Sequence, residues 1–463
     1  MKVIKFIFLL LIVSVLNAVE EKKSIEGDWT GHIDFASLEF HLNFHIEPCE
    51  KGFVGTMEGV DEKATYHLEN ISFDGNDVSF EVPKIHASYK GTFCEEEITG
   101  TFEQGKNFPL VLSRGKIEAS LPKRPQLESI NQSMYKSEDI LIEKDGLTLA
   151  GTFVIPQGKG PFPTVILIAG TGPHDRDETI LGHKPFLVIA DHLAQKGVAS
   201  LRLDKRGCGQ STGKYDEATC WDFITDNLTA IQYLKKRSEV KTIGLIGHSE
   251  GRTIAPEISN QSQAVDFLVL LAGTGTKGSE VVLEQNKIFL EAAEYSKSDI
   301  KQYLELLKQL LEDLLQGKSL DKNAPKLAVI LNEMSPEFKK ECTSTLDQVI
   351  LEIQEPWFHS ALKYDPRPSL SKVSVPVLAI NGSLDMQVTP QQNLYSIKSL
   401  LKNGKNPPVK AVEIKGLNHL LQTAQTGHPS EYAKIEETIS PEVLHLISSW
   451  ILKVDNENVS SAG

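Results

Sequence analysis

The sequence predicts an α/β fold, a mostly parallel sheet with helices on both faces, preceded by a small all-β domain. From about residue 138 onward, short apolar runs alternate with helix-like stretches, which is typical of parallel strands covered on both faces. Residues 25–115 instead alternate apolar and polar side chains, the period of a strand with one buried face. A helix-rich block at residues 277–356 interrupts the first pattern and indicates a helical cap.

Length, composition and charge limit the class of protein. The chain has 463 residues, enough for about two or three domains. Its hydrophobic fraction of 40% and charged fraction of 24% are ordinary for a folded globular protein. The net charge of −14 argues against nucleic acid or an anionic membrane surface as the main partner, because neither would attract such a field.

The N-terminus has the features of a signal peptide over residues 1–18. Lys2 and Lys5 supply the positive region, and residues 6–16 are apolar apart from Ser14. That run is too short to span a bilayer, and Ala18 offers a small residue for cleavage. We therefore expect an exported protein, periplasmic or secreted, with no stable membrane anchor after cleavage. The alternative is an uncleaved anchor.

Residues 25–115 are expected to form a small closed barrel or a sandwich. Residues 38–46 and 78–82 alternate with period two, and turn residues such as Asp74 and Gly75 separate the segments. We count roughly eight short strands, which is enough for closure. Residues near the two ends resemble the lipocalin-like module found ahead of some bacterial hydrolases, namely Gly27, Trp29, Gly31, Gly100, Phe102 and Gly105.

The chain has five cysteines. In an exported protein Cys49 and Cys94 could pair, while free buried thiols are the alternative for every cysteine. Cys208, Cys220 and Cys342 show no metal-ligand spacing. The sequence also lacks the G-x-x-x-x-G-K-[ST] pattern of a phosphate loop, so it predicts neither a metal nor another cofactor.

Residues 116–136 contain prolines and serines with little periodicity and are expected to be a linker. The α/β domain then occupies residues 137–453, with the cap at 277–356. Within the cap, Leu304, Leu307 and Leu311 recur at helical spacing. The expected strands of the sheet are residues 140–143, 147–155, 165–169, 199–203, 243–246, 265–272, 375–380 and 409–414.

Residues 247–251, G-H-S-E-G, match the G-x-S-x-G pattern of a nucleophile elbow. In such a turn, small flanking residues let the chain fold back between a strand and a helix, so that the serine oxygen stands clear of the sheet. Ser249 directly follows the strand at 243–246 and precedes a helix-like run. A second match, at 209–213, lies in a glycine-rich loop. We interpret Ser211 as a turn residue and Ser249 as the nucleophile.

A nucleophilic serine needs a base, and the base needs an acid that orients it. Asp385 ends the turn after the strand at 375–380, and His419 follows the strand at 409–414 and a glycine turn. Both should lie at the carboxyl edge of the parallel sheet, in the chain order expected for this fold. Asp385 and His419 are therefore the predicted acid and base. The competing acids are Asp365 and Glu413, and the competing bases are His359 and His428.

Two backbone N–H donors should form an oxyanion hole. One is expected from Glu250, directly after the nucleophile. The other should come from the loop after the strand at 165–169, which reads Gly-Thr-Gly-Pro, and Thr171 is the predicted donor. A glycine-rich turn needed only for chain reversal is the alternative.

Five motifs occur in the order found in bacterial EstD-type carboxylesterases, which belong to the serine-aminopeptidase-like group of α/β-hydrolases. The motifs are residues 170–177, 204–211, 247–251, 381–385 and 418–419, and the likeness covers roughly residues 138–453. The resemblance implies the α/β-hydrolase fold and ester hydrolysis through an acyl-enzyme. It also implies that Arg206 and the run 175–177 support the site without taking part in the chemistry. Arg252 departs from the family, which usually has glycine there.

We therefore expect a serine hydrolase, a carboxylesterase that acts on small-molecule esters with short to medium acyl groups. A second interpretation is an aminopeptidase-like enzyme acting on short peptides. It would need an acid for the substrate amine, such as Glu284 or Glu291 in the cap. A third is a non-catalytic binding protein on the same fold, against which the intact set of Ser249, Asp385 and His419 argues.

Overall fold

The computed structural model divides into two compact units. Of the described residues, those within 24–33, 41–60 and 64–117 belong to the first unit, and the rest belong to the second. The expected signal peptide at residues 1–18 and Cys342 lie outside the described residues. The structure describes residues 24–35, 38–50, 52–60, 64–85, 87–94, 96–104, 107–117, 122–318, 356–402 and 408–461.

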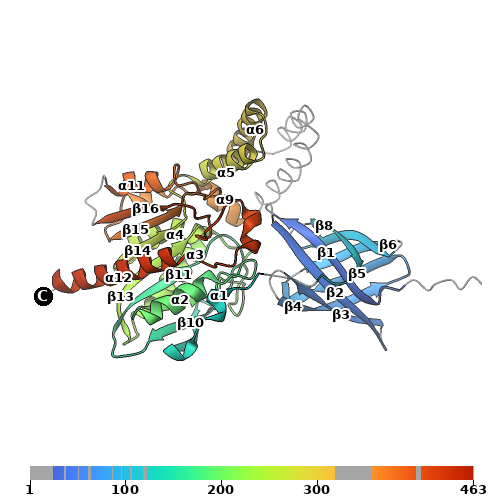
Figure 1. The fold of residues 1–463 in the computed structure, drawn as a ribbon, viewed down its shortest axis with the longest axis horizontal. Helices are drawn as coiled ribbons and strands as arrows, with labels where there is room; N and C mark the ends of the chain where they lie inside the picture. Colours follow the sequence, from blue (N-terminus) through green and yellow to red (C-terminus); the bar gives the residue numbers. More distant parts are fainter. Residues whose placement is uncertain are drawn as a thin grey trace, which may run out of the picture. The chain divides into compact units, whose positions relative to one another are not determined.

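The first unit is a closed, antiparallel barrel of eight strands, in which β1 pairs with both β2 and β8 (Figure 1). This confirms the all-β prediction and selects a barrel over a sandwich. Its interior is filled by buried side chains such as Phe44, Phe80 and Tyr89. The strands are β1 (Gly27–Phe35), β2 (Leu38–Cys49), β3 (Gly52–Gly59), β4 (Ala64–Phe73), β5 (Asp77–Val82), β6 (Ala87–Cys94), β7 (Glu97–Glu103) and β8 (Asn107–Arg114).

The cysteines of the barrel do not form a disulfide. Cys49 and Cys94 are both free and exposed, so the pairing that the sequence allowed is absent and the alternative of buried thiols is also wrong for these two. Cys208 and Cys220 are free and buried, as that alternative expected. Burial raises the pKa of the Cys208 thiol to about 12, which keeps it protonated at neutral pH.

The second unit contains an eight-stranded sheet in the order β16-β15-β14-β13-β11-β12-β10-β9. Neighbours from β12 through β11 to β16 run parallel, whereas β10 pairs antiparallel with β9 and with β12. The predicted mostly parallel sheet is thus confirmed. Its strands are β9 (Tyr135–Lys144), β10 (Leu147–Pro156), β11 (Phe162–Ile168), β12 (Ala199–Leu203), β13 (Val240–His248), β14 (Phe267–Leu271), β15 (Val377–Gly382) and β16 (Val409–Ile414).

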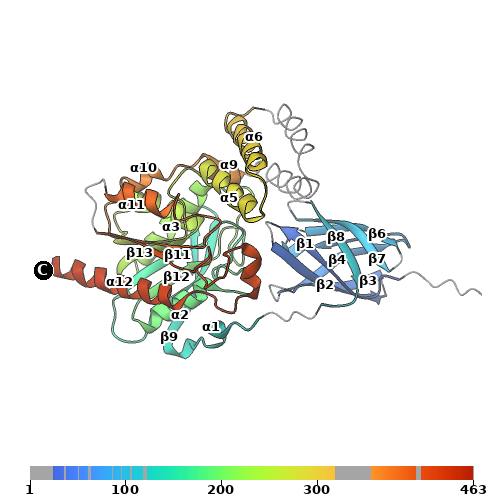
Figure 2. The ribbon, with the colours of Figure 1, turned by 45° about the horizontal axis from the view of Figure 1, so that its top comes forward.

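Helices cover both faces of this sheet (Figure 2). Helices α3, α4 and α11 pack on one face, and α2 and α12 pack on the other. The described helices are α1 (Pro125–Glu128), α2 (Pro185–Gln195), α3 (Cys220–Leu234), α4 (Glu250–Gln261), α5 (Gly278–Ala292), α6 (Lys297–Leu315), α9 (Pro356–Lys363), α10 (Arg367–Leu370), α11 (Leu394–Lys402) and α12 (Pro441–Ser461).

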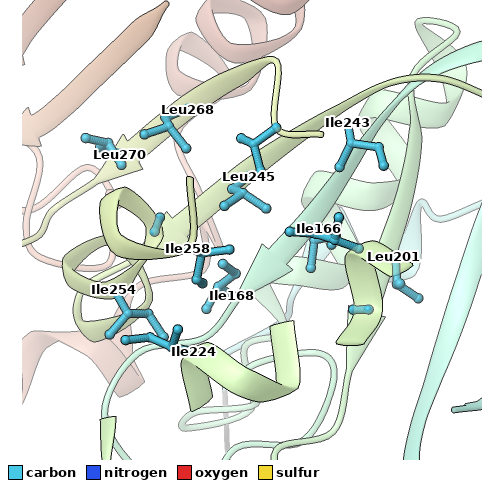
Figure 3. Close-up of a cluster of buried hydrophobic side chains, with 14 of the residues drawn as sticks. Ile166, Ile168, Leu201, Ile224, Ile243, Leu245, Ile254, Ile258, Leu268 and Leu270 are labelled. Atoms are coloured by element: carbon cyan, nitrogen blue, oxygen red, sulfur yellow. The ribbon is translucent and has the colours of Figure 1, made fainter. Parts of the chain in front are cut away.

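The core on the α3–α4 face consists mainly of isoleucine and leucine side chains, with Phe153 and Phe223 among them. Figure 3 shows Ile166 and Leu245 on the strands facing Ile258 on α4. Successive parallel strands need apolar residues on both faces, because helices cover both. The apolar runs of the sequence therefore correspond to strands buried over nearly their whole length, such as β14.

Helices α5, α6 and α9 pack against one another through Leu290, Leu307 and Leu362, with further buried leucines around them. Of the leucines noted in the sequence, Leu307 and Leu311 are buried and Leu304 is partly buried. Helices α5 and α6 occupy the described part of the expected cap, and α9 begins at its predicted end, Pro356, and continues to Lys363. The rest of that block, residues 319–355, lies outside the described residues.

Residues 122–136, part of the stretch assigned to the linker, carry a short helix and pack within the second unit. The buried Arg124 guanidinium donates to the carbonyl oxygens of Leu181, Ala433 and Ile435 at 3.0, 2.9 and 2.8 Å. In none of the described segments is a helix both long enough and apolar enough to cross a membrane.

Helix α4 and strand β11 approach each other so closely that only glycine fits at one position. A Cβ on Gly251 would lie 2.0 Å from the carbonyl oxygen of Ile168. Gly251→Ala should therefore destabilise the protein by about 1–3 kcal/mol, because the backbone of β11 must shift. Helix propensity alone would give the opposite sign, about 1 kcal/mol in favour of alanine. Urea unfolding of the second unit measures the difference.

The matched control is Ser259→Ala on the same helix, where the side chain is only half-buried. Its free energy of unfolding should change by less than about 0.5 kcal/mol. A Gly251→Ala variant as stable as the unsubstituted protein would contradict the close approach.

Candidate active site

Ser249 lies at the turn between β13 and α4, where its backbone adopts φ 52° and ψ −113°. A positive φ is unfavourable for a residue with a side chain and persists only where the surroundings enforce it. Gly247 allows the return of the chain, because a Cβ there would lie 2.4 Å from the backbone nitrogen of Arg252. The strand, sharp turn and helix expected around Ser249 are all present.

His419 links the serine to a buried carboxylate. Its Nε2 lies 3.2 Å from Ser249 Oγ, and its Nδ1 lies 3.0 and 3.1 Å from the two carboxylate oxygens of Asp385. Because an ionised carboxylate can only accept, Nδ1 carries the proton and Nε2 is left as the acceptor for the serine hydroxyl. The structure thus brings together the three side chains that the sequence selected from separate strand ends.

The loop after β15 fixes Asp385. Its carboxylate accepts hydrogen bonds from the backbone nitrogens of Gln387 and Val388, at 3.0 and 2.8 Å. The Asn381 side chain donates to it at 3.1 Å. The residue is only 3% exposed, so these donors replace the water that an isolated carboxylate would need. The carboxylate is therefore held in one orientation toward His419.

A second buried pair lies behind His419. His248 Nδ1 lies 3.0 Å from Glu178 Oε1, and its Nε2 donates to the carbonyl oxygen of His419 at 3.1 Å. Burial opposes charge on both groups, but their mutual attraction and hydrogen bond outweigh it. The pKa of His248 is raised and that of Glu178 is lowered. The pair therefore holds the backbone carbonyl of His419, while Asp385 holds its ring.

Loop 170–172 lies against Ser249, since a Cβ on Gly170 would be 3.1 Å from Ser249 Cβ. The N–H of Gly170 donates to Glu178 at 2.6 Å, and that of Gly172 donates to the Tyr215 hydroxyl at 3.1 Å. The N–H of Thr171 has no acceptor in the described part of the chain. The N–H of Glu250, at the start of α4, is likewise without one. Both predicted donors thus remain available beside Ser249.

The motif at 204–211 takes part in several ion pairs. Arg206 binds the carboxylates of Asp222 and Asp226 at 2.8 and 2.7 Å. Arg176 binds Asp204 at 2.7 Å. These charges are satisfied by one another and do not touch Ser249, which agrees with the supporting role that the resemblance implies.

The side chain of Arg252 fits beside Gly273, which lies in the loop after β14. Arg252 is 1% exposed, and a Cβ on Gly273 would lie 2.2 Å from Arg252 Cδ. Burial lowers the pKa of Arg252 to about 9, although the charge of Asp385 partly opposes this. No hydrogen-bond partner for its guanidinium is found among the described residues. Gly273 therefore supplies the space that this departure from the family requires.

None of the competing candidates contacts Ser249 in the described part of the chain. Asp365 binds Arg367 at 2.7 Å, and Glu413 accepts from the Tyr395 hydroxyl at 2.7 Å. The His428 ring lies 5.9 Å from that of Phe289 on α5. His359 is on α9 and none of the contacts found in the described segments joins it to Ser249.

The sequence reasoning did not identify Glu178, His248 or Lys205 as parts of the site. Lys205 Nζ lies 2.9 Å from Glu250 Oε2 and also donates to the carbonyl oxygen of Gly170. Both His248 and Lys205 lie inside motifs that were noted, which was the available signal. Glu178 directly follows the motif at 170–177, but no pattern in the sequence indicated that its loop meets His248. Across the described segments, no three His, Cys, Asp or Glu side chains gather as a metal site.

Comparison with known proteins finds a family, a relative and several solved structures to which the chain is similar. The family model for serine aminopeptidase, S33, matches residues 184–424. The esterase EstD of Thermotoga maritima is 29% identical over 339 residues, 73% of this chain and 71% of the relative. Est1E from Butyrivibrio proteoclasticus, solved with ferulic acid bound, is 18% identical at a TM-score of 0.41 and covers 69% of this chain and 99% of its own. A proline iminopeptidase from Mycobacterium smegmatis is 13% identical at a TM-score of 0.43, covering 69% and 100%.

Ser211, the serine of the second G-x-S-x-G match, links β10 to the segment that follows β12. Its hydroxyl donates to the carbonyl oxygen of Asp204 at 2.8 Å and accepts from the N–H of Ala150 at 2.9 Å. Ser211→Ala should cost about 1–3 kcal/mol of stability, because the buried N–H of Ala150 loses its acceptor. Hydrogen exchange should show a faster exchange of the Ala150 amide. The exposed Ser449→Ala is the control and should leave this amide unchanged.

Proposed function

The chain belongs to the serine aminopeptidase S33 family of hydrolases and has the α/β-hydrolase fold, and we propose that it cleaves carboxylic esters of short to medium acyl groups. The observation that carries the proposal is the chain of hydrogen bonds from Ser249 through His419 to Asp385. A serine hydroxyl is a weak nucleophile unless an adjacent base removes its proton. This arrangement supplies the base and fixes its tautomer.

In the proposed reaction, Ser249 Oγ attacks the ester carbonyl carbon while its proton moves to His419 Nε2. The resulting imidazolium is stabilised by the Asp385 carboxylate. The tetrahedral intermediate collapses, the alcohol leaves with the proton from His419, and the acyl group remains on Ser249. Water, deprotonated by His419, then releases the acid in the same way and restores the serine.

The oxyanion of each tetrahedral intermediate needs donors that are already in place. We assign this role to the N–H groups of Thr171 and Glu250, which flank Ser249 and have no acceptor within the described residues. The N-terminus of α4 also favours negative charge at this point.

An ester substrate is favoured over a peptide by the state of the nearby acids. The Glu250 carboxylate is paired with Lys205 and with the Trp357 indole, so it is not free to bind a substrate amine. Glu284 on α5 pairs with Lys287 at 3.7 Å, and no contact found among the described residues joins the side chain of Glu291 to Ser249. The esterase name of the Thermotoga maritima relative supports the same choice.

Ser249→Ala should abolish hydrolysis of p-nitrophenyl acetate and labelling by a fluorophosphonate, because both require an activated serine. The decrease in kcat should be about 10⁶-fold, the scale found when such a nucleophile is removed. Ser211→Ala is the matched control and should keep both activities at a temperature where it is folded. Amino-acid p-nitroanilides, assayed in parallel, should be cleaved far more slowly than the ester. Labelling that persists in Ser249→Ala would refute the assignment.

The acyl-chain preference follows from the helices near the site. Trp357 on α9 donates to the side chain of Glu250, directly beside the nucleophile. Phe289 on α5 contacts His428, in the segment that follows His419. Helices over the site exclude water and limit the length of the acyl group. We therefore propose a closed acyl pocket of limited depth.

Hydrolysis across acetyl, butyryl, octanoyl and palmitoyl p-nitrophenyl esters should peak at acetyl or butyryl, because longer chains meet the cap. Phe289→Ala should shift the optimum toward longer chains, since it removes a contact between α5 and the His428 loop. Glu291→Ala, exposed on the same helix, should leave the profile unchanged. A maximum at palmitoyl in the unsubstituted enzyme would exclude a closed pocket.

A further inference from the structure

We propose that Lys205 is a positioning residue that orients both backbone donors of the oxyanion hole through one ammonium group. The inference rests on the proposed function, because it assigns Lys205 a part in the same reaction. Lys205 follows β12, and its side chain is 10% exposed. Its Nζ donates to the carbonyl oxygen of Gly170 and lies 2.9 Å from Glu250 Oε2. One residue therefore joins the two segments that carry the donors.

The contact with Gly170 sets the direction of the Thr171 N–H. The carbonyl of Gly170 and the N–H of Thr171 belong to the same peptide unit, which is planar and trans, so the two groups point in opposite directions. Because Lys205 binds the carbonyl, the N–H of Thr171 is directed away from Lys205. Neighbouring contacts reinforce this orientation: the carbonyl oxygen of Thr171 accepts from His174 Nε2 at 2.7 Å, and the N–H of Gly170 is bound to Glu178.

The ammonium also acts on this peptide electrostatically. A cation at the carbonyl oxygen polarises the amide and makes its N–H a stronger donor, as in any chain of cooperative hydrogen bonds. The effect is larger in a dry environment than in water. Lys205 therefore contributes to the strength of the Thr171 donor as well as to its direction.

The contact with Glu250 fixes the second donor. Its carboxylate accepts from Lys205 through Oε2 and from the Trp357 indole through Oε1. With both oxygens held, the side chain of the first residue of α4 has one orientation, and its backbone N–H stays beside Ser249. The link from Trp357 also ties the cap helix α9 to the same residue.

The surroundings keep Lys205 on these two partners. The ammonium lies 4.6 Å from the centre of the Phe223 ring and 5.8 Å from that of Tyr215. A cavity of about 30 Å³ adjoins it, lined by Phe223, Asp226, Glu250 and Ile254 among others. The aromatic rings limit access of water, while the cavity leaves space for a somewhat larger cation at this position.

The consequence is specific to the transition state. Negative charge on the substrate oxygen develops only there, so donors that lose their orientation should lower kcat while KM changes little. A general loosening of the fold would instead lower stability and affect substrate binding as well. The division between kcat and KM therefore separates positioning from a purely structural role.

Lys205→Met tests this, because methionine keeps an extended apolar side chain but has no ammonium. With p-nitrophenyl acetate, kcat should fall about 10²-fold, the scale for one lost oxyanion donor, and KM should change less than about threefold. A trifluoromethyl ketone, which forms a tetrahedral adduct with the serine, should bind about 10²-fold more weakly for the same reason. Lys205→Arg, which keeps a cation next to the cavity, should recover most of kcat.

Lys214→Met is the matched control, since Lys214 also pairs with a glutamate but on the exposed surface. It should match the unsubstituted enzyme in all three measurements. The double variant Lys205→Met/Glu250→Gln identifies the origin of the loss. If kcat stays low, the peptide of Gly170 has lost its support, as proposed. Full recovery would show that only an unpaired Glu250 charge was responsible and would overturn the inference.

A folded Lys205→Met variant with kcat within about threefold of the unsubstituted enzyme would also overturn it. Should Lys205→Met fail to fold, Glu250→Gln decides, because it weakens one of the two contacts: kcat should fall about tenfold at constant KM, and an unchanged kcat refutes the inference. Unsubstituted enzyme and Ser249→Ala are assayed alongside. Absence of Ser249-dependent hydrolysis would overturn the proposed function itself, whereas an active enzyme unaffected by loss of Lys205 overturns only the inference.

Discussion

The backbone of Ser249 holds φ 52° and ψ −113°, a conformation that a residue with a side chain leaves unless its neighbours prevent it. What prevents it is close packing at the turn, where the end of β11, the end of β13 and the first turn of α4 approach one another at glycines. A Cβ on Gly247 or Gly251 would lie 2.4 or 2.0 Å from backbone atoms of this junction. Gly273 makes room for Arg252 in the same way. The position of the serine thus depends on glycines that allow this close packing, together with the hydrogen bond from its N–H to the carbonyl oxygen of Leu271 at 3.0 Å.

Around this rigid turn, the polar groups form successive layers. In the first layer, His419 contacts Ser249 and Asp385 contacts His419. In the second layer, His248 binds the backbone carbonyl of His419, and Glu178 binds the backbone N–H of Gly170. Each buried charge in these layers has an opposite charge or several N–H donors, which offsets the loss of water. Because the second layer binds mostly backbone atoms, it controls the directions of N–H and C=O groups as well as side chains.

The sequence predicted what depends on local pattern. Asp385 and His419 each follow a strand, and parallel strands end at one edge, so their meeting with Ser249 could be inferred without coordinates. The contacts of Glu178 with His248 could not, because they join loops whose approach depends on packing of the whole sheet. Barrel closure could not be predicted either. It depends on the pairing of β1 with β8, for example Trp29 with Arg114, and these strands are the first and last of the barrel in the sequence. The spacing of the cysteines in the sequence could not show whether Cys49 and Cys94 are paired or free, because that depends on where the barrel strands place them.

The outer strands of the eight-stranded sheet, β9 and β16, have a further consequence for how copies of the chain meet. An outer strand presents unpaired backbone groups on which another strand can add, the first step of many aggregation reactions. Charged side chains are placed along both: Lys136, Asp139, Glu143 and Lys144 are exposed on β9, and Lys410 is exposed on β16. A strand adding at either margin would have to bury or oppose these charges. The barrel needs no such protection, because a sheet closed on itself has no margin to offer.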